Sequence, residues 1–492
     1  MSARAMMETA RNSAQALREA GLPARLVELH ELVHRLRDRQ EEVVERIMAD
    51  TGKTRTDALV SEVLGTLDCL HWLVSKGPRY LEDEKASTPL ALLGKKSRIW
   101  YEPLGVVLVI TPWNYPFHIS LTGVATALLA GNSVILKPSE HTPLKGLLEE
   151  LLDGLPLLAS SVQVAYGEGD LAEALIDAGP DKIVFTGSAP TGKKILRQAA
   201  EQFIPVELEL GGKDAMIVFE DVDLKRTVAG ALWGAMTNSG QSCTSVERLY
   251  VHRSIHDDFV ARLRQEMDRL VLGSGDDGNA DLGAMTTSFQ YDIVQRHLDD
   301  AREKGATLHG GQGHESERMI TPALVTGVTS EMALMKEETF GPVVPVVPFD
   351  DEEEVIRQAN SLPFGLSASV WSRDLRRAER VARALGVGAV SINNVMLTEG
   401  NPALPFGGVG ESGYGRTKGV EGLRAMCRSK AVLIDKQSGT IEANWYPYTR
   451  EKYRLFTDLI RGLFSGGLSA WVRFARAGLK LESHSQKPRD GQ

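Results

Sequence analysis

Short apolar segments alternate with helical segments between residues 106 and 203, and this alternation restricts the fold more than any other feature of the sequence. The run Val106–Ile110 is fully apolar, as expected for a strand buried on both faces of a parallel sheet. Residues 133–136, 162–164 and 182–185 repeat the strand pattern, and segments with helical periodicity separate them. Repeated β-α-β units predict an α/β fold with a doubly wound, mostly parallel sheet that binds a nucleotide.

Composition narrows the class of protein. The chain has 492 residues, of which 42% are hydrophobic and 25% charged, so we expect two or three domains. A net charge of −9 leaves no dominant basic field, which argues against nucleic acid as a partner. Three cysteines do not make a disulfide framework. Without a secretory signal or a membrane-spanning apolar run, a cytoplasmic protein is expected.

Asn114 follows the first apolar strand. Pro112 and Pro116 fix the turn and leave Asn114 at the carboxyl end of the strand, where open α/β sheets bind their ligands. An asparagine in this place is more often an ordinary turn residue. Its functional interpretation is an amide that donates to a developing oxyanion.

The turn Gly187–Lys194 nearly matches the phosphate loop of nucleotide hydrolases. Lys194 occupies the position at which the phosphate loop has a hydroxyl that binds magnesium. An ATPase function would therefore lack its metal ligand. The turn still places a glycine before the N-terminus of a helix, whose free N–H groups can bind a pyrophosphate. A dinucleotide is the expected ligand.

Glu209 ends a strand-like segment just before Gly211 and Gly212. Strand alternation places Glu207 and Glu209 on the same side, and an exposed sheet face would explain Glu207. Glu209, at the strand end, suits a carboxylate that activates a water.

Cys243 lies among small residues between a helical run and a strand-like run. A thiol in such a junction can be reached, and nearby N–H groups or a positive neighbour would lower its pKa. A buried structural cysteine is the alternative. The histidines show no zinc spacing, so no metal is expected.

Between about residues 100 and 430 the chain resembles the aldehyde dehydrogenase superfamily. The matching motifs are Pro112-Trp113-Asn114, Lys137-Pro138-Ser139-Glu140, Phe185-Thr186-Gly187-Ser188, Glu209-Leu210-Gly211-Gly212, Gly240-Gln241-Ser242-Cys243, Glu338-Thr339-Phe340-Gly341-Pro342 and Pro405-Phe406-Gly407-Gly408. The short front end and the tail Trp445-Tyr446-Pro447-Tyr448 are similar to the class 3 and fatty-aldehyde branch, which is often homodimeric.

The resemblance implies a role for each catalytic residue. Cys243 would attack the aldehyde carbon, with the oxyanion held by the Asn114 amide and the Cys243 N–H. After hydride transfer, Glu209 would activate the water that hydrolyses the thioester. Branches that pass the acyl group to coenzyme A generally lack this glutamate. The implied reaction is NAD(P)-dependent oxidation of an aldehyde, medium- or long-chain aliphatic or aromatic, to a carboxylic acid. A coenzyme A-acylating enzyme, or a non-catalytic binding protein on this fold, is the alternative.

The cofactor contacts are also implied by the resemblance. They are Lys137 and Glu140 at the adenosine ribose, Ser188 at the pyrophosphate, Glu338 at the nicotinamide ribose, Phe340 at the nicotinamide end, and Trp113 and Gly187 through their motifs. A carboxylate at position 140 would repel a 2′-phosphate, so we expect NAD, with NADP also accepted.

The predicted domains follow the resemblance. They are a helical N-terminus and NAD-binding domain over 1–208, a catalytic domain over 209–395, a return segment over 396–450 and a tail over 451–492, with 82–103 in an oligomerisation arm. The tail has two apolar helical stripes around Gly466-Gly467, and the second has basic residues beside it. Residues 453–480 could lie on a membrane surface or pack near the substrate entrance. After Glu482 we expect disorder.

Overall fold

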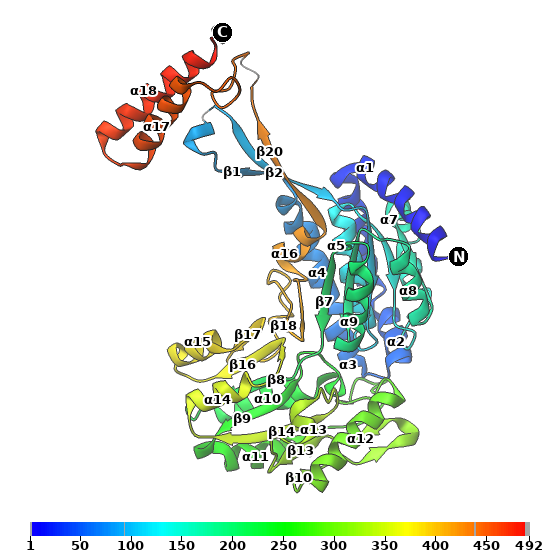
Figure 1. The fold of residues 1–492 in the computed structure, drawn as a ribbon. Helices are drawn as coiled ribbons and strands as arrows, with labels where there is room; N and C mark the ends of the chain where they lie inside the picture. Colours follow the sequence, from blue (N-terminus) through cyan, green and yellow to red (C-terminus); the bar gives the residue numbers. More distant parts are fainter. Residues whose placement is uncertain (1, 93, 437–438, 488–492) are drawn as a thin grey trace. The chain divides into compact units, whose positions relative to one another are not determined.

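The computed structural model describes residues 2–92, 94–436 and 439–487. The chain separates into two compact units (Figure 1). One contains the N-terminal region up to Glu82 together with Tyr101–Ser429, and the other contains Asp83–Trp100 together with the chain from Lys430 onwards. The domain boundaries predicted at 208/209, 395/396 and 450/451 stay predictions.

The first unit contains a six-stranded sheet in the order β19-β7-β6-β3-β4-β5. Its strands are β3 (Val106–Ile110), β4 (Ser133–Lys137), β5 (Val162–Val164), β6 (Lys182–Gly187), β7 (Val206–Leu210) and β19 (Gly413–Tyr414). All neighbours are parallel except the β19–β7 pair. The chain starts in the middle with β3, moves outward to β5 and returns to β6, so the direction of winding reverses between β3 and β6. The predicted doubly wound sheet is confirmed.

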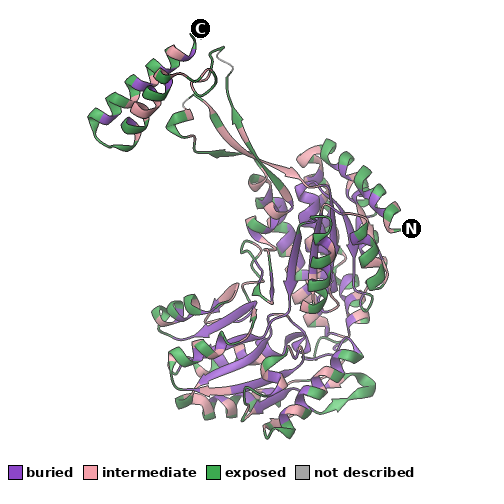
Figure 2. Cartoon of the chain, viewed as in Figure 1, coloured by how far each residue is buried: buried purple, intermediate pink, exposed green. Residues whose placement is uncertain are grey.

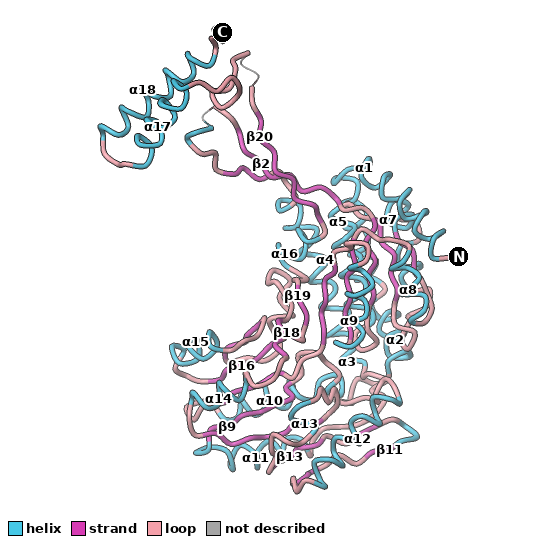
Figure 3. Tube along the Cα trace, viewed as in Figure 1, coloured by secondary structure: helices cyan, strands magenta, loops and turns pink. Residues whose placement is uncertain are grey.

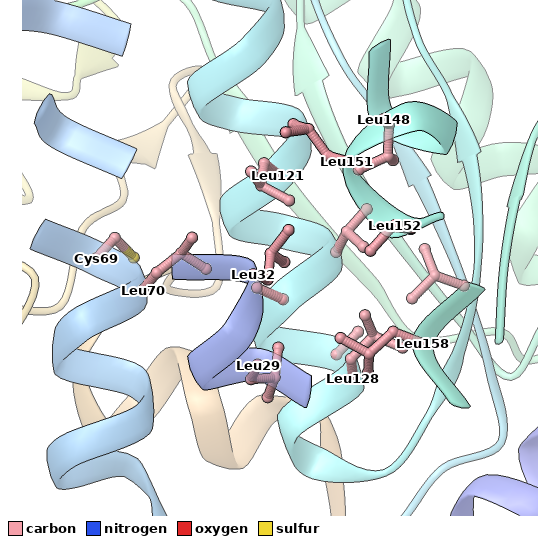
Figure 4. Close-up of a cluster of buried hydrophobic side chains, with 14 of the residues drawn as sticks. Leu29, Leu32, Cys69, Leu70, Leu121, Leu128, Leu148, Leu151, Leu152 and Leu158 are labelled. Carbon is pink, nitrogen blue, oxygen red and sulfur yellow. The ribbon is translucent and has the colours of Figure 1, made fainter. Parts of the chain in front are cut away.

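Helices cover both faces of this sheet. They are α1 (Ala3–Asp38), α2 (Gln40–Thr51), α3 (Arg55–Asp57), α4 (Gly65–Lys76), α5 (Pro116–Ala130), α6 (Leu147–Leu152), α7 (Pro156–Ser161), α8 (Gly169–Asp177) and α9 (Ala189–Ala200), with a π-helix at Ala58–Leu64 between α3 and α4. Strand β3 alternates between the two faces, since Val107 and Val109 belong to the core under α1, α4 and α5 while Leu108 belongs to the core under α8 and α9. Figure 4 shows leucines of these helices, such as Leu32 and Leu121, in the first core.

A seven-stranded sheet forms the second layered part of the same unit, in the order β10-β13-β14-β9-β8-β16-β17. Its strands are β8 (Asp214–Val218), β9 (Val246–His252), β10 (Thr307–His309), β13 (Ala323–Thr326), β14 (Val343–Phe349), β16 (Ser367–Trp371) and β17 (Ala389–Ile392). The helices of this part are α10 (Leu224–Met236), α11 (Arg253–Met267), α12 (Ser288–Glu303), α13 (Ala333–Lys336), α14 (Glu352–Ala359) and α15 (Leu375–Ala384). Helix α16 (Gly419–Ala425) packs on α5 instead, and its Leu423 is buried in the core of the first sheet. The central strands of both sheets, such as β3, β7, β8 and β16, are buried (Figure 2).

Four short strands make two small ribbons, β11 (Gly313–His314) with β12 (Met319–Ile320) and β15 (Phe364–Gly365) with β18 (Val409–Gly410). Within the described residues, Arg55–Tyr80 is the one helical segment long and apolar enough to cross a membrane by composition. Its apolar residues Leu70 and Leu73 are buried in the core of the first sheet, which accounts for its hydropathy.

The second unit contains two helices and most of the three-stranded sheet β1-β2-β20, whose strands β2 and β20 continue into the first unit. The bounds are β1 (Glu84–Ala86), β2 (Lys96–Pro103), β20 (Cys427–Ile434), α17 (Arg450–Phe464) and α18 (Leu468–Ser485). The expectation of disorder after Glu482 was wrong for the first residues beyond it, because α18 continues to Ser485, whose side chain is buried. Residues 488–492 lie outside the described part of the chain.

Candidate active site

One cavity of about 370 Å³ joins the two sheets of the first unit. Of the predicted site residues, those that line it are Cys243, Asn114, Glu209, Trp113, Gly187, Ser188, Glu338 and Phe340. Asn114 follows β3 and Ser188 follows β6, so both flank the place where the winding of the sheet reverses, and loops leave the strands there (Figure 3). Ligands of open α/β sheets bind at this reversal.

Asn114 is held in place from several sides. Its side-chain Nδ2 donates to the backbone carbonyl of Gln241 at 3.0 Å, two residues before Cys243. Its own carbonyl accepts from Lys53 Nζ at 2.9 Å and from Asn238 Nδ2 at 3.2 Å. The amide is therefore tied to the loop that carries the thiol.

Lys53 and Glu62 form a buried ion pair behind Asn114, with side chains 1% and 0% exposed. Glu62 lies in the π-helix and also accepts from the backbone N–H groups of Phe117 at 2.7 Å and His118 at 3.2 Å, at the first turn of α5. This pair positions both the Asn114 loop and the helix that follows it. The sequence had placed these residues in the helical N-terminus without a role in the site. The residues between Lys53 and Glu62 include Arg55 and Asp57, so the sequence did not distinguish this pair from its charged neighbours.

The loop before Cys243 has unusual backbone geometry. Asn238, Ser239 and Gly240 have φ values of 52°, 53° and 72°. A Cβ at Gly240 would lie 2.0 Å from the carbonyl oxygen of Gly341, so only glycine fits there. Asp57 stabilises this turn by accepting from Asn238 N at 3.0 Å. Such strain is tolerated where surrounding contacts hold a functional loop in place.

The electrostatic surroundings of Cys243 differ from the expectation of a lowered pKa. Burial raises the pKa of the thiol well above its ordinary value, and the nearby carboxyl groups of Glu399, Asp214 and Glu338 raise it further. The sequence showed small residues on both sides of Cys243, but it did not indicate that carboxyl groups from distant segments would lie near the thiol. Without ligand, the thiol is therefore protonated at neutral pH.

Glu209 is 4% exposed, and neither of its carboxylate oxygens has a hydrogen-bond partner in the described structure. Burial, and then the charge of Glu207, raise the pKa of Glu209 well above that of an ordinary carboxyl, while Arg416 and Lys418 oppose the shift. An unpaired buried carboxyl that lines a cavity with a thiol has the environment of a tuned acid or base.

Glu207 does not lie on an exposed sheet face, as the sequence had suggested. It is buried and forms an ion pair with Lys182 at 3.1 Å, since β6 and β7 are neighbours. Lys182 also donates to the carbonyl of Ala425 at 2.9 Å. Alternation along β7 could not reveal that the opposite face of the strand is covered as well.

The nicotinamide side of the predicted cofactor site contains Glu338 and an aromatic group. Gly212 N donates to Glu338 at 3.1 Å, and burial followed by the charge of Glu247 raises the pKa of Glu338 to about 8. Trp113 packs edge-on against Phe340, with ring centroids 5.4 Å apart. These residues offer a carboxylate and an apolar wall on one side of the cavity.

The predicted adenosine side lies at the ends of β4 and β6. Lys137 and Glu140 are not among the residues that line the cavity; Lys137 Nζ donates to Glu140 at 2.8 Å. Partial burial is the largest single influence on the pKa of Glu140 and raises it, but the hydrogen bond from Lys137, a backbone hydrogen bond and the charge of Lys137 together lower the pKa below its ordinary value. Ser188 precedes α9, whose N-terminus has no side-chain cap hydrogen bond. A free helix N-terminus and an ionised carboxylate fit the pyrophosphate and ribose of a dinucleotide.

Lys418 is a further cavity residue that the sequence did not suggest. Its Nζ donates to the carbonyl of Glu399 at 2.6 Å and lies 3.3 Å from His118 Nε2. Burial, and then the charges of Lys418 and Lys53, lower the pKa of His118 well below its ordinary value. The imidazole is thus neutral, with Nε2 accepting from Lys418 and Nδ1 donating to Thr66 at 3.1 Å.

Comparison with known proteins agrees with this arrangement. The aldehyde dehydrogenase family model matches residues 1–432. A 4,4'-diapolycopene aldehyde oxidase from a Methylomonas species is 44% identical over 457 residues, covering 92% of this chain and 86% of that protein. The structure of a putative aldehyde dehydrogenase from Anabaena variabilis matches at 34% identity with a TM-score of 0.86, covering 90% of this chain and 95% of its own.

An aldehyde dehydrogenase from Bacillus cereus, solved as its NAD⁺ complex, matches at 32% identity with a TM-score of 0.82 over 88% of each chain. Family match, fold and cavity agree on the cofactor class and on the reaction class. The chain therefore belongs to the aldehyde dehydrogenase family, whose enzymes oxidise aldehydes with NAD(P).

Proposed function

We propose that this enzyme oxidises medium- or long-chain aliphatic, or aromatic, aldehydes to free carboxylic acids. The observation that supports a free acid as the product is Glu209, a buried carboxyl group without a hydrogen-bond partner in the described structure, which lines the same cavity as Cys243. The apolar substrate class is supported by Val109, Ile119 and Met426 along the same cavity. The tail similarity to the fatty-aldehyde branch supports it as well, and the Methylomonas relative is named for an aldehyde of diapolycopene.

Each chemical step is assigned to a residue of this chain. The Cys243 thiol gives its proton to water as the sulfur forms a bond to the aldehyde carbon, while the Asn114 amide and the Cys243 N–H stabilise the oxyanion. Ser188, Glu338 and Phe340 would hold NAD, which would supply the acceptor for the hydride on that carbon. Glu209 then takes a proton from the attacking water, and the carbon–sulfur bond of the thioester breaks to release the acid.

NAD is proposed as the preferred cofactor, with NADP accepted less well. The ionised carboxylate of Glu140, paired with Lys137, can accept from ribose hydroxyls and would repel a 2′-phosphate. We further propose a homodimer in the cytoplasm. The branch similarity supports the dimer, and three free thiols support a reducing compartment. Sedimentation velocity of the purified enzyme tests the dimer.

The deciding experiment follows NADH formation with a series of aldehydes of increasing chain length. Cys243→Ala should abolish NADH formation, and Glu209→Gln should give one burst of NADH followed by a stall at the acyl-enzyme. Normal steady-state turnover of Glu209→Gln would contradict the assigned water activation. If added coenzyme A accelerated NADH formation by the wild-type enzyme, the correct function would be the coenzyme A-acylating oxidation of aldehydes. Absence of NADH with every aldehyde would favour a binding protein.

A further inference from the structure

Helix α18 presents two different faces, and the larger apolar face has no partner among the described residues of its own unit. Small residues on one side pack against α17, where Gly462 allows such close approach that a Cβ would lie 2.5 Å from Phe474 N. The packed row consists of Ala470, Ala477 and Leu481, all buried. These residues recur at i, i+7 and i+11 and thus share one side of the helix.

The opposite side of α18 carries a row of apolar residues, most of them large. They are Leu468, Trp471, Val472, Ala475 and Leu479, which recur at i, i+3, i+4, i+7 and i+11. Leu468 is 84% exposed, Leu479 70%, Trp471 56% and Val472 48%. Figure 2 shows this helix largely in the colour of exposed residues. A two-residue offset turns this row about 200° away from the packed row, so α17 cannot cover it.

Basic side chains flank the exposed row. Arg473, Arg476 and Lys480 are exposed and lie beside it on the helical wheel, whereas Glu482 is the one acidic residue of α18. Between residues 450 and 487 the chain has eight Lys or Arg residues and three Asp or Glu, in a protein whose total net charge is −9. The positive charge is thus concentrated where the apolar face is exposed.

We propose that the exposed face of α18 docks on an anionic lipid bilayer. Large apolar side chains that include a tryptophan, with arginine and lysine beside them, are typical of a helix that lies in the plane of a membrane interface. The bilayer would take the apolar row into the region between headgroups and acyl chains. The flanking cations would then contact lipid phosphates and carboxylates.

The test uses the full-length enzyme and vesicles, without aldehyde or NAD. Wild-type protein should float with vesicles of phosphatidylcholine that contain phosphatidylserine, and less with pure phosphatidylcholine or at high salt. The triple variant Arg473→Gln, Arg476→Gln, Lys480→Gln should bind about a hundred-fold more weakly, at roughly five-fold per cation. The matched control neutralises Arg376 and Arg383 of α15 and Arg373 just before this helix, all three exposed, and should bind like wild type.

A second pair of variants tests the apolar row. Trp471→Ser with Leu479→Ser should lose at least about ten-fold in vesicle affinity. The control, Leu375→Ser with Val27→Ser, removes residues of the same exposure, 57% and 70%, from the other unit. All variants should oxidise a short, water-soluble aldehyde at the wild-type rate in the absence of vesicles, which shows that the catalytic unit is folded.

Three results would overturn the proposal. Wild-type enzyme could fail to bind anionic vesicles, or could bind pure phosphatidylcholine equally well, or the α18 variants and their controls could bind alike. A change of sedimentation coefficient in the α18 variants, without vesicle binding by the wild type, would assign the face to a contact between copies of the chain. Because binding is measured without substrate, none of these results bears on the proposed oxidation.

Discussion

Removing the buried cation behind Asn114 should reduce catalysis more than it reduces cofactor binding. Lys53→Met keeps the length of the side chain but leaves Glu62 without its partner and removes one of the two donors to the Asn114 carbonyl. Breaking a fully buried ion pair from one side costs about 3–5 kcal/mol of stability. We expect the lower end of this range, because Glu62 still accepts from Phe117 N and His118 N.

The catalytic effect follows from the position of the Asn114 amide. Loss of an oxyanion donor lowers kcat by about 10²–10³, and Lys53→Met displaces this donor without deleting it. A fall in kcat of about 10- to 100-fold is therefore expected, with little change in the Kd for NAD. The assay is steady-state NADH formation, normalised to Cys243 thiols titrated in the folded enzyme, together with urea unfolding and an NAD-binding titration.

A double-mutant cycle and an exposed pair provide the controls. Lys53→Met combined with Glu62→Gln removes both charges and should cost less stability than the sum of the single changes, by roughly 1–3 kcal/mol. Asp350→Asn breaks the exposed pair with Arg253, whose side chains are both 60% exposed, and should cost less than about 1 kcal/mol without affecting kcat. Additive stability losses, or a folded Lys53→Met enzyme with wild-type kcat, would refute the positioning role.

Three further changes test the cofactor site and the general base. The pKa of Glu209 is raised in the folded enzyme, so its ionisation in the unfolded chain destabilises the native state as pH rises above about 4.5. Glu209→Gln should therefore resist urea better than wild type at about pH 8 and lose this advantage near pH 5. An advantage in stability that does not depend on pH would disprove this linkage. Gly211→Ala would place a Cβ 2.4 Å from Glu338 Oε2 and should weaken NAD binding about ten-fold or more, measured by fluorescence titration, by displacing that carboxylate. Glu140→Gln should raise kcat/KM for NADP relative to NAD about ten-fold, and an unchanged ratio would show that this carboxylate does not select the cofactor.

Local patterns in the sequence were sufficient to predict the parallel sheet and to select Asn114, Glu209 and Cys243, which the structure places at the cavity. Apolar strands such as Val106–Ile110 alternate with helices, and this predicted the parallel sheet that the structure contains. Proline and glycine at strand ends marked the loops of Asn114, Glu209 and Cys243. Strand and helix periods depend only on neighbouring residues, so a single sequence can reveal them.

Charge and burial required the tertiary structure. The sequence did not indicate that Lys53 reaches the carbonyl of Asn114, that Glu207 meets Lys182 across two strands, or that acidic groups from distant segments surround Cys243. In the tail, the sequence showed the apolar row of α18 but not that smaller residues make the contact with α17. A pKa or an exposed face depends on which elements pack together, and that packing joins residues far apart in the chain.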